Sequence, residues 1–354
     1  MIRRLVPLLL VLTLAACGRS GDGDAPAAEA PAVPDPAKGV VNLYTARHYD
    51  ADLKLYDAFT RATGVKVNRM EMNPDALIER IKAEGDASPA DVIIMADAGA
   101  LWRAQQAGAF QKAGLPELDT AIPPQLREPN GLWYGFSRRA RVIAYDKAKV
   151  KPEEVATYEA LASPRFKGKV CARTSENVYN LSLMAALIEH WGHDKALAWA
   201  KGVVANFARP PQGEDITQIR AIGAGVCEVT LTNSYYYLRV ARSQAPADKT
   251  VAAKVALSFP NLAGQGTHEN ISGAGLAAHA PNPGQARQFL TFLASPTAQS
   301  IFAGANNEFP VIAGVQPPPE VAAYAGFKAD PLPMTALGAR QAEAQAIYDQ
   351  AGWR

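Results

Sequence analysis

Short apolar strands alternate with amphipathic helices along the chain from residue 40 onwards, and this alternation limits the folds open to it. Extended runs occur at Val40–Tyr44, Val65–Met70 and Val92–Ala96. A helical repeat separates the first two runs, and a second one, Leu77–Lys82, precedes the third. Strands separated by helices pair in parallel, because each helix carries the chain back to the same end of the sheet. We therefore predict an α/β layer in this part of the chain.

The same alternation returns between residues 157 and 255, with strands expected at Lys169–Ala172 and Cys227–Leu231. Extended segments near residues 135 and 267 join the two blocks. A chain of 354 residues has the length of two domains, so we predict two lobes with a cleft between them. The expected boundaries are 40–135 with 268–315 for the N-lobe, and 136–267 with 316–354 for the C-lobe.

The N-terminal residues have the features of an export signal. Residues 1–16 contain two arginines, a short apolar run and small residues before Cys17. The apolar run is too short for a membrane-spanning helix. Because its end matches a bacterial lipobox, we expect a lipid on Cys17 and a periplasmic protein anchored to a membrane. Residues 17–38, rich in Gly, Ala, Pro and acidic residues, are predicted to form a disordered tether.

Two further cysteines, Cys171 and Cys227, remain once Cys17 is assigned to lipid. An even number of cysteines in an oxidising compartment favours a disulfide, and two buried free thiols are the alternative. Loss of Arg3 and Arg4 with the signal removes the formal net charge of +2. Nucleic-acid binding requires a basic surface, so we expect no nucleic-acid partner.

Residues 233–237 read Asn-Ser-Tyr-Tyr-Tyr. Adjacent side chains of a strand point to opposite faces, so two neighbouring phenols can converge only where the backbone turns or begins a helix. Phenolates are hard anionic oxygen donors that suit a small trivalent cation such as Fe³⁺, which lowers their pKa far below the usual value near 10. An aromatic patch that supports a neighbouring element is the alternative explanation of this run.

Phenols also follow two other predicted strands. Tyr49, next to His48, follows the first strand, and Tyr179 follows the strand at Lys169–Ala172. Ligands of α/β sheets bind beyond the carboxyl ends of the strands. Three strand ends therefore present phenols to the expected cleft, a placement that randomly distributed core aromatics would not produce.

Six segments of the chain resemble the ferric-iron-binding solute-binding proteins of bacterial ABC importers. They are Leu43–Tyr49, Leu126–Pro129, Ser175–Asn180, Ala205–Gly213, Asn233–Tyr236 and Thr267–Gly275. The resemblance extends from Val41 to about Val315. It implies an α/β, two-lobed type II periplasmic binding protein fold with a hinge and an interlobe cleft. It also implies Fe³⁺ as the transported ligand and an ABC permease as the partner.

The resemblance assigns the iron ligands residue by residue. In the tyrosine-rich branch of the family they are Tyr49, Tyr179, Tyr235 and Tyr236, with His48 as an optional further ligand. Another branch uses a His, a Glu, the tyrosine pair and a bound anion, and no residue of this chain matches that Glu. Tyr237 lies outside the ligand pattern and is expected to pack.

Four phenolates around Fe³⁺ leave one net negative charge, which is costly to bury without nearby cations. The resemblance points to Arg139 and Arg239, either hydrogen-bonded to phenolate oxygens or holding an auxiliary anion such as carbonate. Water is the other group that could complete the coordination. From the sequence alone, Arg239 could equally be a surface arginine and the basic run around Arg139 a solvated face.

We expect a monomeric protein that captures Fe³⁺ outside the cytoplasm for an ABC permease, and not an enzyme. The alternative is a protein of the same fold for another small ligand. A polyamine would require carboxylates and aromatic walls, and an organic anion would require arginines and helix N-termini. An exported hydrolase is disfavoured, because the sequence contains neither a Gly-x-Ser-x-Gly nor a His-Glu-x-x-His motif.

Overall fold

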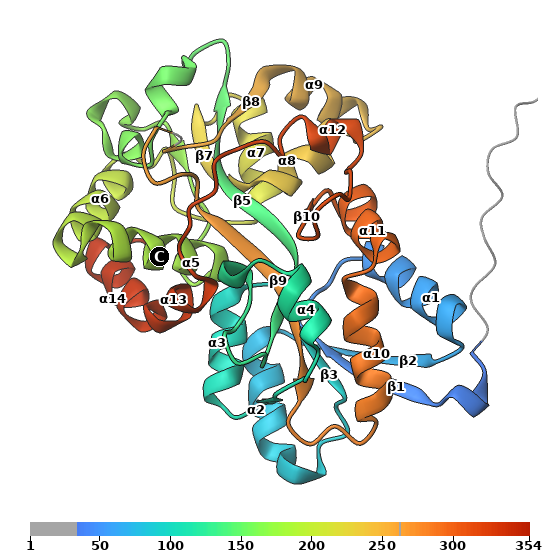
Figure 1. Cartoon of the computed structure of the whole chain (residues 1–354). Coiled ribbons are helices and arrows are strands. Elements are labelled where there is room, and N and C mark those ends of the chain that lie inside the picture. Colours follow the sequence, from blue (N-terminus) through green and yellow to red (C-terminus); the bar gives the residue numbers. More distant parts are fainter. Residues whose placement is uncertain (1–33, 262) are drawn as a thin grey trace, which may run out of the picture. The chain divides into compact units, whose positions relative to one another are not determined.

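A computed structural model describes residues 34–261 and 263–354 (Figure 1). The chain divides into two units, Met1–Pro31 and Ala32–Arg354, and the second unit contains the fold. The expected signal peptide, Cys17 and most of the tether lie outside the described residues. Pro36–Lys38, within the range expected for the tether, form a short 3-10 turn. None of the described helices is both long and apolar enough to cross a membrane.

The described strands form one mixed sheet. In chain order they are β1 Val40–Thr45, β2 Lys66–Glu71, β3 Val92–Met95, β4 Phe110–Gln111, β5 Tyr134–Asp146, β6 Val170–Cys171, β7 Val229–Asn233, β8 Val255–Ser258, β9 Glu269–Ala277 and β10 Phe309–Pro310. The strand order is β2-β1-β3-β9-β5-β7-β6. Strand β4 pairs with β9, whereas β8 and β10 pair with β5.

The α-helices connect these strands and pack on the sheet. They are α1 Ala51–Thr63, α2 Pro74–Glu84, α3 Ala98–Gln106, α4 Pro116–Ala121, α5 Val178–Trp191, α6 His193–Ala205, α7 Asp215–Gly223, α8 Ser234–Ala241, α9 Pro246–Lys254, α10 Pro283–Leu293, α11 Pro296–Asn306, α12 Pro319–Ala322, α13 Met334–Ala339 and α14 Gln341–Ala351. Local sequence sets several of their ends. The Asp97 side chain accepts hydrogen bonds from the Gly99 and Ala100 amides at the start of α3. Gly64, in the left-handed conformation with a φ of 77°, ends α1.

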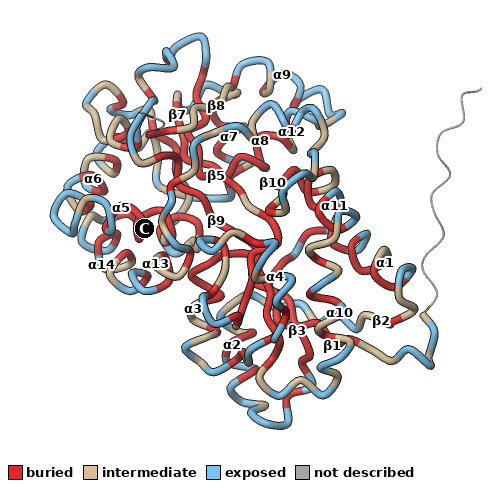
Figure 2. Tube along the Cα trace, in the orientation of Figure 1, coloured by how far each residue is buried: buried red, intermediate tan, exposed pale blue. Residues whose placement is uncertain are grey.

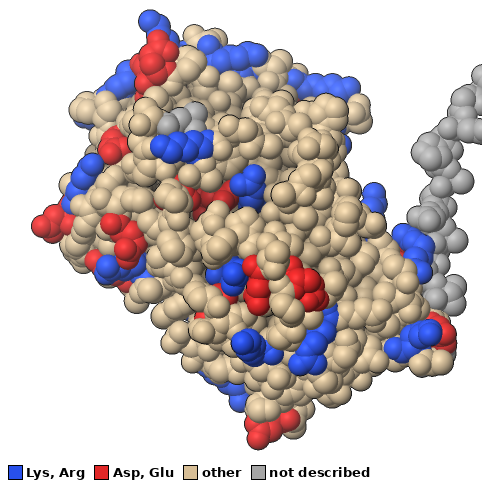
Figure 3. Space-filling model, in the orientation of Figure 1, with Lys and Arg blue, Asp and Glu red and all other residues tan. Residues whose placement is uncertain are grey.

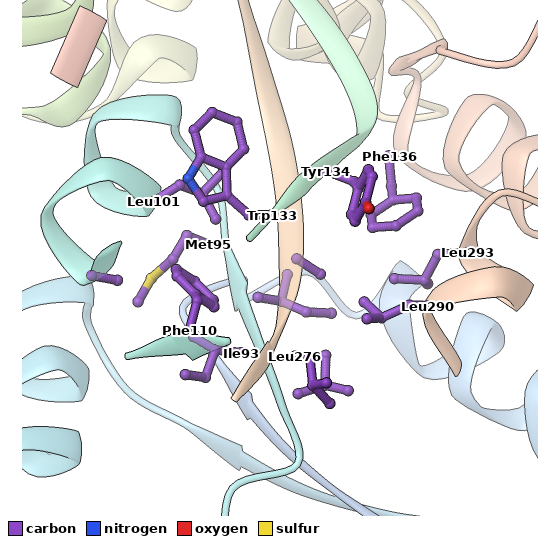
Figure 4. Packing of buried hydrophobic residues seen from close by; sticks show 14 of the residues in the cluster. Ile93, Met95, Leu101, Phe110, Trp133, Tyr134, Phe136, Leu276, Leu290 and Leu293 are labelled. Atoms are coloured by element: carbon purple, nitrogen blue, oxygen red, sulfur yellow. The ribbon is translucent and has the colours of Figure 1, made fainter. Parts of the chain in front are cut away.

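The first block has the parallel pairing that the sequence predicted. Strand β1 pairs in parallel with both β2 and β3. Its core lies between the sheet and the helices α3 and α10 (Figure 4). There Ile93 and Met95 of β3, Leu276 of β9, Leu101 of α3 and Leu290 of α10 belong to one buried cluster. This burial removes apolar side chains from water and stabilises the first block.

Strands β5 and β9 join the two blocks, as predicted from the extended segments near residues 135 and 267. They pair with each other in antiparallel orientation over Tyr134–Ala140 of β5. The following half of β5, Arg141–Asp146, pairs with β7 and β8 of the second block. Figure 1 shows both strands passing between the two groups of helices, and Figure 2 shows them buried. The backbone that connects the blocks is therefore a buried sheet.

The second block has its own core, formed mainly on α5, α6 and α14. The C-terminal segment contributes to both cores. Met334 and Leu337 of α13 lie in the first cluster, whereas Ile347 and Trp353 lie in the second. Cys171 and Cys227 form the disulfide that the sequence favoured, with a Cα–Cα distance of 5.7 Å. It links the end of β6 to the residues just before β7.

Charged side chains of both signs are distributed over the face shown in Figure 3. Opposite-charge pairs at the surface include Arg80 with Glu84 at 2.7 Å and Lys82 with Glu79 at 2.8 Å. Pairs as exposed as these contribute little to stability.

Candidate metal centre

The hydroxyl groups of three tyrosines from distant parts of the chain meet in a triangle. The Tyr49 and Tyr235 oxygens are 3.0 Å apart, those of Tyr235 and Tyr179 are 3.2 Å apart, and those of Tyr49 and Tyr179 are 3.3 Å apart. None of the three residues is more than 5% exposed. Because a hydroxyl both donates and accepts, the three groups satisfy one another when they are protonated.

Each phenol reaches the triangle from the end of a different strand. Tyr49 follows β1, in the turn that leads into α1. Tyr179 is the second residue of α5, and its amide donates to the Asn177 side chain that caps this helix. Tyr235 is the second residue of α8, which begins directly after β7. The tyrosine run therefore starts a helix, as the requirement for converging hydroxyls predicted.

Tyr236 lies beside the triangle. Its ring centre is 4.3 Å from that of Tyr235, with 39° between the planes. Together with His48 and Tyr179 it lines a cleft of about 510 Å³. Tyr237 points elsewhere, because its hydroxyl donates to the Val255 carbonyl at 3.2 Å. The expectation that Tyr237 packs is confirmed.

His48 is exposed at the wall of this cleft, and its ring centre lies 4.8 Å from that of Tyr49. The geometry brings it next to the phenol cluster without making it part of the triangle. Its role as a ligand stays a prediction. The triangle and Tyr236 thus account for the four expected tyrosines, and His48 borders them.

Burial keeps Tyr49, Tyr235 and Tyr236 protonated in the absence of a cation. It raises the pKa of Tyr49 and Tyr235 well above the usual value, and negative charge on the neighbouring tyrosines raises both further. The pKa of Tyr236 is raised mainly by burial and next by negative charge on Tyr179. A cation that binds these oxygens must therefore displace protons from them.

Arg239 stacks against three of the phenols. Its guanidinium carbon is 4.7 Å from the ring centre of Tyr49, 5.3 Å from that of Tyr235 and 5.4 Å from that of Tyr236. The side chain donates to Asn306. Arg239 is half-buried and faces the rings, rather than being fully exposed at the surface. Its cation faces the rings and would offset negative charge on their oxygens.

Arg139 is 1% exposed, and its guanidinium carbon lies 5.6 Å from the ring centre of Tyr179. It donates to the Ser272 hydroxyl at 3.1 Å and to the Ala96 carbonyl. The alternative of a solvated basic face is therefore wrong for this residue. The side chain of Arg139 thus donates to Ser272 and Ala96, and that of Arg239 donates to Asn306. Among the described residues, neither side chain donates a hydrogen bond to a phenol oxygen.

A third guanidinium at the site, Arg47, was not assigned a role from the sequence. Its carbon lies 4.8 Å from the ring centre of Tyr49. Two buried carboxylates hold it, Asp52 at 2.8 Å and Glu308 at 3.1 Å. The only sequence signal was its position two residues before Tyr49, inside a segment that carried the family resemblance.

Arg141 and Arg173 complete the set of arginines. Their guanidinium carbons lie 6.0 and 5.7 Å from the Tyr179 ring centre. Both donate to Asp215, at 2.6 and 3.1 Å, and the same carboxylate accepts the Asn233 amide at 2.8 Å. Burial alone would raise the pKa of Asp215, but Arg141 and Arg173 outweigh it and hold that pKa below its usual value. Nothing in the sequence singled out Asp215.

The five guanidiniums and three carboxylates around the phenols leave a surplus of two positive charges. This surplus suits a cluster of phenolates that carries net negative charge. The described residues contain no group of three or more His, Cys, Asp or Glu side chains able to hold a metal. The site instead presents phenol oxygens, which in their anionic form are donors that suit a hard cation.

Comparisons with known proteins agree with this geometry. The profile of the bacterial extracellular solute-binding protein family matches residues 54–329. Iron uptake protein A1 of Synechocystis sp. is 48% identical over 341 residues, which is 96% of this chain and 93% of that protein. A Trichodesmium protein solved in complex with iron and citrate ligands is 51% identical, with a TM-score of 0.85 over 89% of this chain and 100% of that chain.

A ferric binding protein from Campylobacter jejuni has 36% identity and a TM-score of 0.85, and it covers 89% of this chain and 100% of that one. These matches confirm the predicted α/β, two-lobed periplasmic binding protein fold. The named relatives are binding and uptake proteins rather than enzymes. The chain belongs to the family of bacterial extracellular solute-binding proteins.

Proposed function

We propose that this protein captures Fe³⁺ outside the cytoplasm and delivers it to an ABC permease for iron uptake. The observation that carries the proposal is the triangle of buried phenol oxygens, 3.0–3.3 Å apart, that three strand ends bring together. Relatives that share about half of the sequence are named for iron uptake or were solved with iron. Phenolate oxygen is the donor type that a trivalent iron ion prefers.

The proposed ligands are Tyr49, Tyr179, Tyr235 and Tyr236, with His48 at the open side of the cluster. Each tyrosine loses its proton when iron binds, and the surrounding arginines offset the resulting negative charge. Carbonate or water would complete the coordination at the cleft, where Tyr236 and His48 lie. The chain is proposed to bind and release the ion without performing a reaction.

Closure of two lobes would assemble this ligand set. We propose residues 40–135 with 268–315 as one lobe and 136–267 with 316–354 as the other, with Tyr49 in the first and the other three tyrosines in the second. Bending at β5 and β9 would then move the lobes. Asp97, at the start of α3, supports the closed arrangement by accepting hydrogen bonds from Ser182 of α5 at 2.9 Å and from Asn270 at 2.7 Å.

The proposed setting is the periplasm, with the protein a monomer anchored to a membrane by a lipid on Cys17. A tether over residues 17–38 would separate the folded part from the membrane and leave it free to reach the permease. Membership of an extracellular solute-binding family supports this location.

Metal analysis of the purified protein together with its visible spectrum tests the proposal. After aerobic loading with ferric iron, we expect one iron per chain and a visible charge-transfer band from phenolate–iron bonds. The same samples should be tested with a polyamine and with an organic anion, the two rival ligand classes. A protein that stays colourless and iron-free, or that binds one of these rivals instead, would contradict the proposal.

A further inference from the structure

The C-terminal end of the chain reaches the segment that presents Tyr179. Tyr348 of α14 and Trp353 are 0% and 1% exposed. The Trp353 indole Nε1 donates to the Arg173 carbonyl at 2.9 Å, and the Tyr348 hydroxyl donates to the Asn180 carbonyl at 2.9 Å. These two acceptors lie on either side of Tyr179 in the sequence.

Both acceptors also take part in the metal centre through their side chains. The guanidinium of Arg173 faces the Tyr179 ring at 5.7 Å. The Asn180 side chain accepts from Arg141 at 2.8 Å and donates to the Thr174 carbonyl at 2.9 Å. The backbone of residues 173–180 is therefore tied to the C-terminal residues at one position before the tyrosine and at another immediately after it.

The sequence of the C-terminus explains how the indole reaches this position. Gly352 adopts φ 74 and ends α14, which turns the chain so that Trp353 points inward. The indole then packs in an aromatic group, with ring-centre distances of 5.0 Å to Phe207, 5.0 Å to Tyr348 and 6.1 Å to Trp199. The two nearer rings, Phe207 and Tyr348, hold the indole N–H toward its acceptor, because a large buried ring has few alternative orientations.

We propose that Trp353 and Tyr348 are positioning residues for iron binding, because they fix the backbone that carries Arg173 and Tyr179. The inference rests on the proposed function, in which Tyr179 is an iron ligand. The ring contacts and side-chain hydrogen bonds of Trp353 and Tyr348 go to other residues than the phenols of the cluster, and neither side chain is charged. Their effect on iron must therefore act through the position of residues 173–180.

Two conservative substitutions remove the donors and keep aromatic rings in place. Trp353→Phe removes the indole N–H, and Tyr348→Phe removes the hydroxyl. Each substitution removes one hydrogen-bond donor from a backbone carbonyl, that of Arg173 or that of Asn180, and so loosens residues 173–180. From the usual contribution of one hydrogen bond, we expect iron release to accelerate about threefold to tenfold in each variant.

Trp199→Phe is a matched control. Trp199 belongs to the same aromatic group and also uses its indole N–H to bond a backbone carbonyl, that of Tyr158 at 2.7 Å. Trp199→Phe removes the same number of atoms as Trp353→Phe, and it removes the same kind of hydrogen bond, from an indole N–H to a backbone carbonyl. Tyr158 lies outside residues 173–180, so the control should lower the melting temperature without changing the rate of iron release.

The experiment follows the decay of the visible iron band after the loaded full-length protein is mixed with excess chelator, and it records the melting temperature of each variant. Faster release in Trp353→Phe and Tyr348→Phe than in Trp199→Phe supports the inference. Release at the control rate in both overturns it, and an effect in only one variant restricts the role to that residue. If Trp353→Phe does not fold, the result for Tyr348→Phe decides.

A colourless wild-type protein would overturn the proposed function and this inference with it. A coloured wild-type protein whose variants release iron at the control rate would overturn the inference alone.

Discussion

Each phenol of the cluster experiences two opposing electrostatic effects. Burial favours the protonated, neutral form and raises the pKa of Tyr49 and Tyr235. Guanidiniums within 4.7–6.0 Å of the rings favour the phenolate. A trivalent cation decides between the two states, because it can replace several protons at once. This competition would allow buried tyrosines to serve as the proposed iron ligands.

The adjacent pair of phenols should be essential for iron. Replacing Tyr235 or Tyr236 with Phe keeps the ring and removes one ligand oxygen. We expect iron affinity to fall by more than the roughly 10- to 100-fold typical of residues that only support a ligand. Competition with a chelator, followed by the visible band, measures the change. Tyr237→Phe is the control, because its hydroxyl bonds Val255; an equal loss in this control would contradict the assignment.

Arg239 should stabilise the iron-bound state through its charge. Its replacement by Met retains much of the side-chain volume and removes the cation that faces three rings. We expect iron binding to weaken by about 10- to 100-fold. Arg242→Met is the matched control at the C-terminal end of the same helix, since Arg242 directly follows α8, donates to the Gly304 carbonyl at 3.0 Å and is not stacked on the phenols. Unchanged affinity in the Arg239 variant would exclude the charge-offsetting role.

Iron affinity should decrease as the pH is lowered. Burial raises the pKa of Tyr49, Tyr235 and Tyr236, so these three phenols are protonated in the free protein and must release protons when iron binds. Lower pH favours the protonated, iron-free form, and the logarithm of the affinity should fall by up to one unit per pH unit for each phenol that ionises. Chelator competition at several pH values, with proton release followed in weak buffer, measures this dependence. An affinity independent of pH would show that the tyrosines do not ionise on binding.

At the scale of elements, the disulfide connects the two strands that precede three of the four tyrosines. Cys171 lies at the end of β6, and Cys227 lies just before β7. The bond closes a loop across 56 positions of sequence. It therefore restricts the unfolded chain and links the end of β6, the strand before Tyr179, to the start of β7, the strand before Tyr235.

Removing this bond should destabilise the protein. The chain-entropy argument gives a contribution of about 4 kcal/mol for a loop of this length. We expect the double substitution Cys171→Ala and Cys227→Ala to lower the free energy of unfolding by about that amount. Denaturant unfolding in buffer without oxidant or reductant gives the free energy of unfolding of the wild type and of the variant. An unchanged midpoint would contradict a stabilising role of the bond.

The sequence predicted the elements of this site better than its supporting contacts. The alternation of strands and helices placed Tyr49, Tyr179 and Tyr235 at strand ends, and the tyrosine run predicted the start of α8. These features depend on local pattern. Asp215 could not be predicted, because its role depends on Arg141, which lies 74 positions away in the sequence. The burial of Arg139 was likewise set by tertiary packing rather than by its basic neighbours.

At the scale of the whole folded unit, the site depends on elements from both blocks. Tyr49 follows a strand of the first block, whereas Tyr179 and Tyr235 belong to helices of the second. Contacts such as Asp97 with Ser182 hold the blocks together near the phenols. In the proposed site, a single ion must therefore contact side chains from both blocks at the same time.

Anomalous diffraction from crystals of the iron-loaded protein tests this requirement most directly, because it locates the ion independently of the surrounding atoms. We expect one iron peak at bonding distance from the oxygens of Tyr49, Tyr179, Tyr235 and Tyr236. A peak held by other side chains, or one bonded to the tyrosines of a single block only, would contradict it.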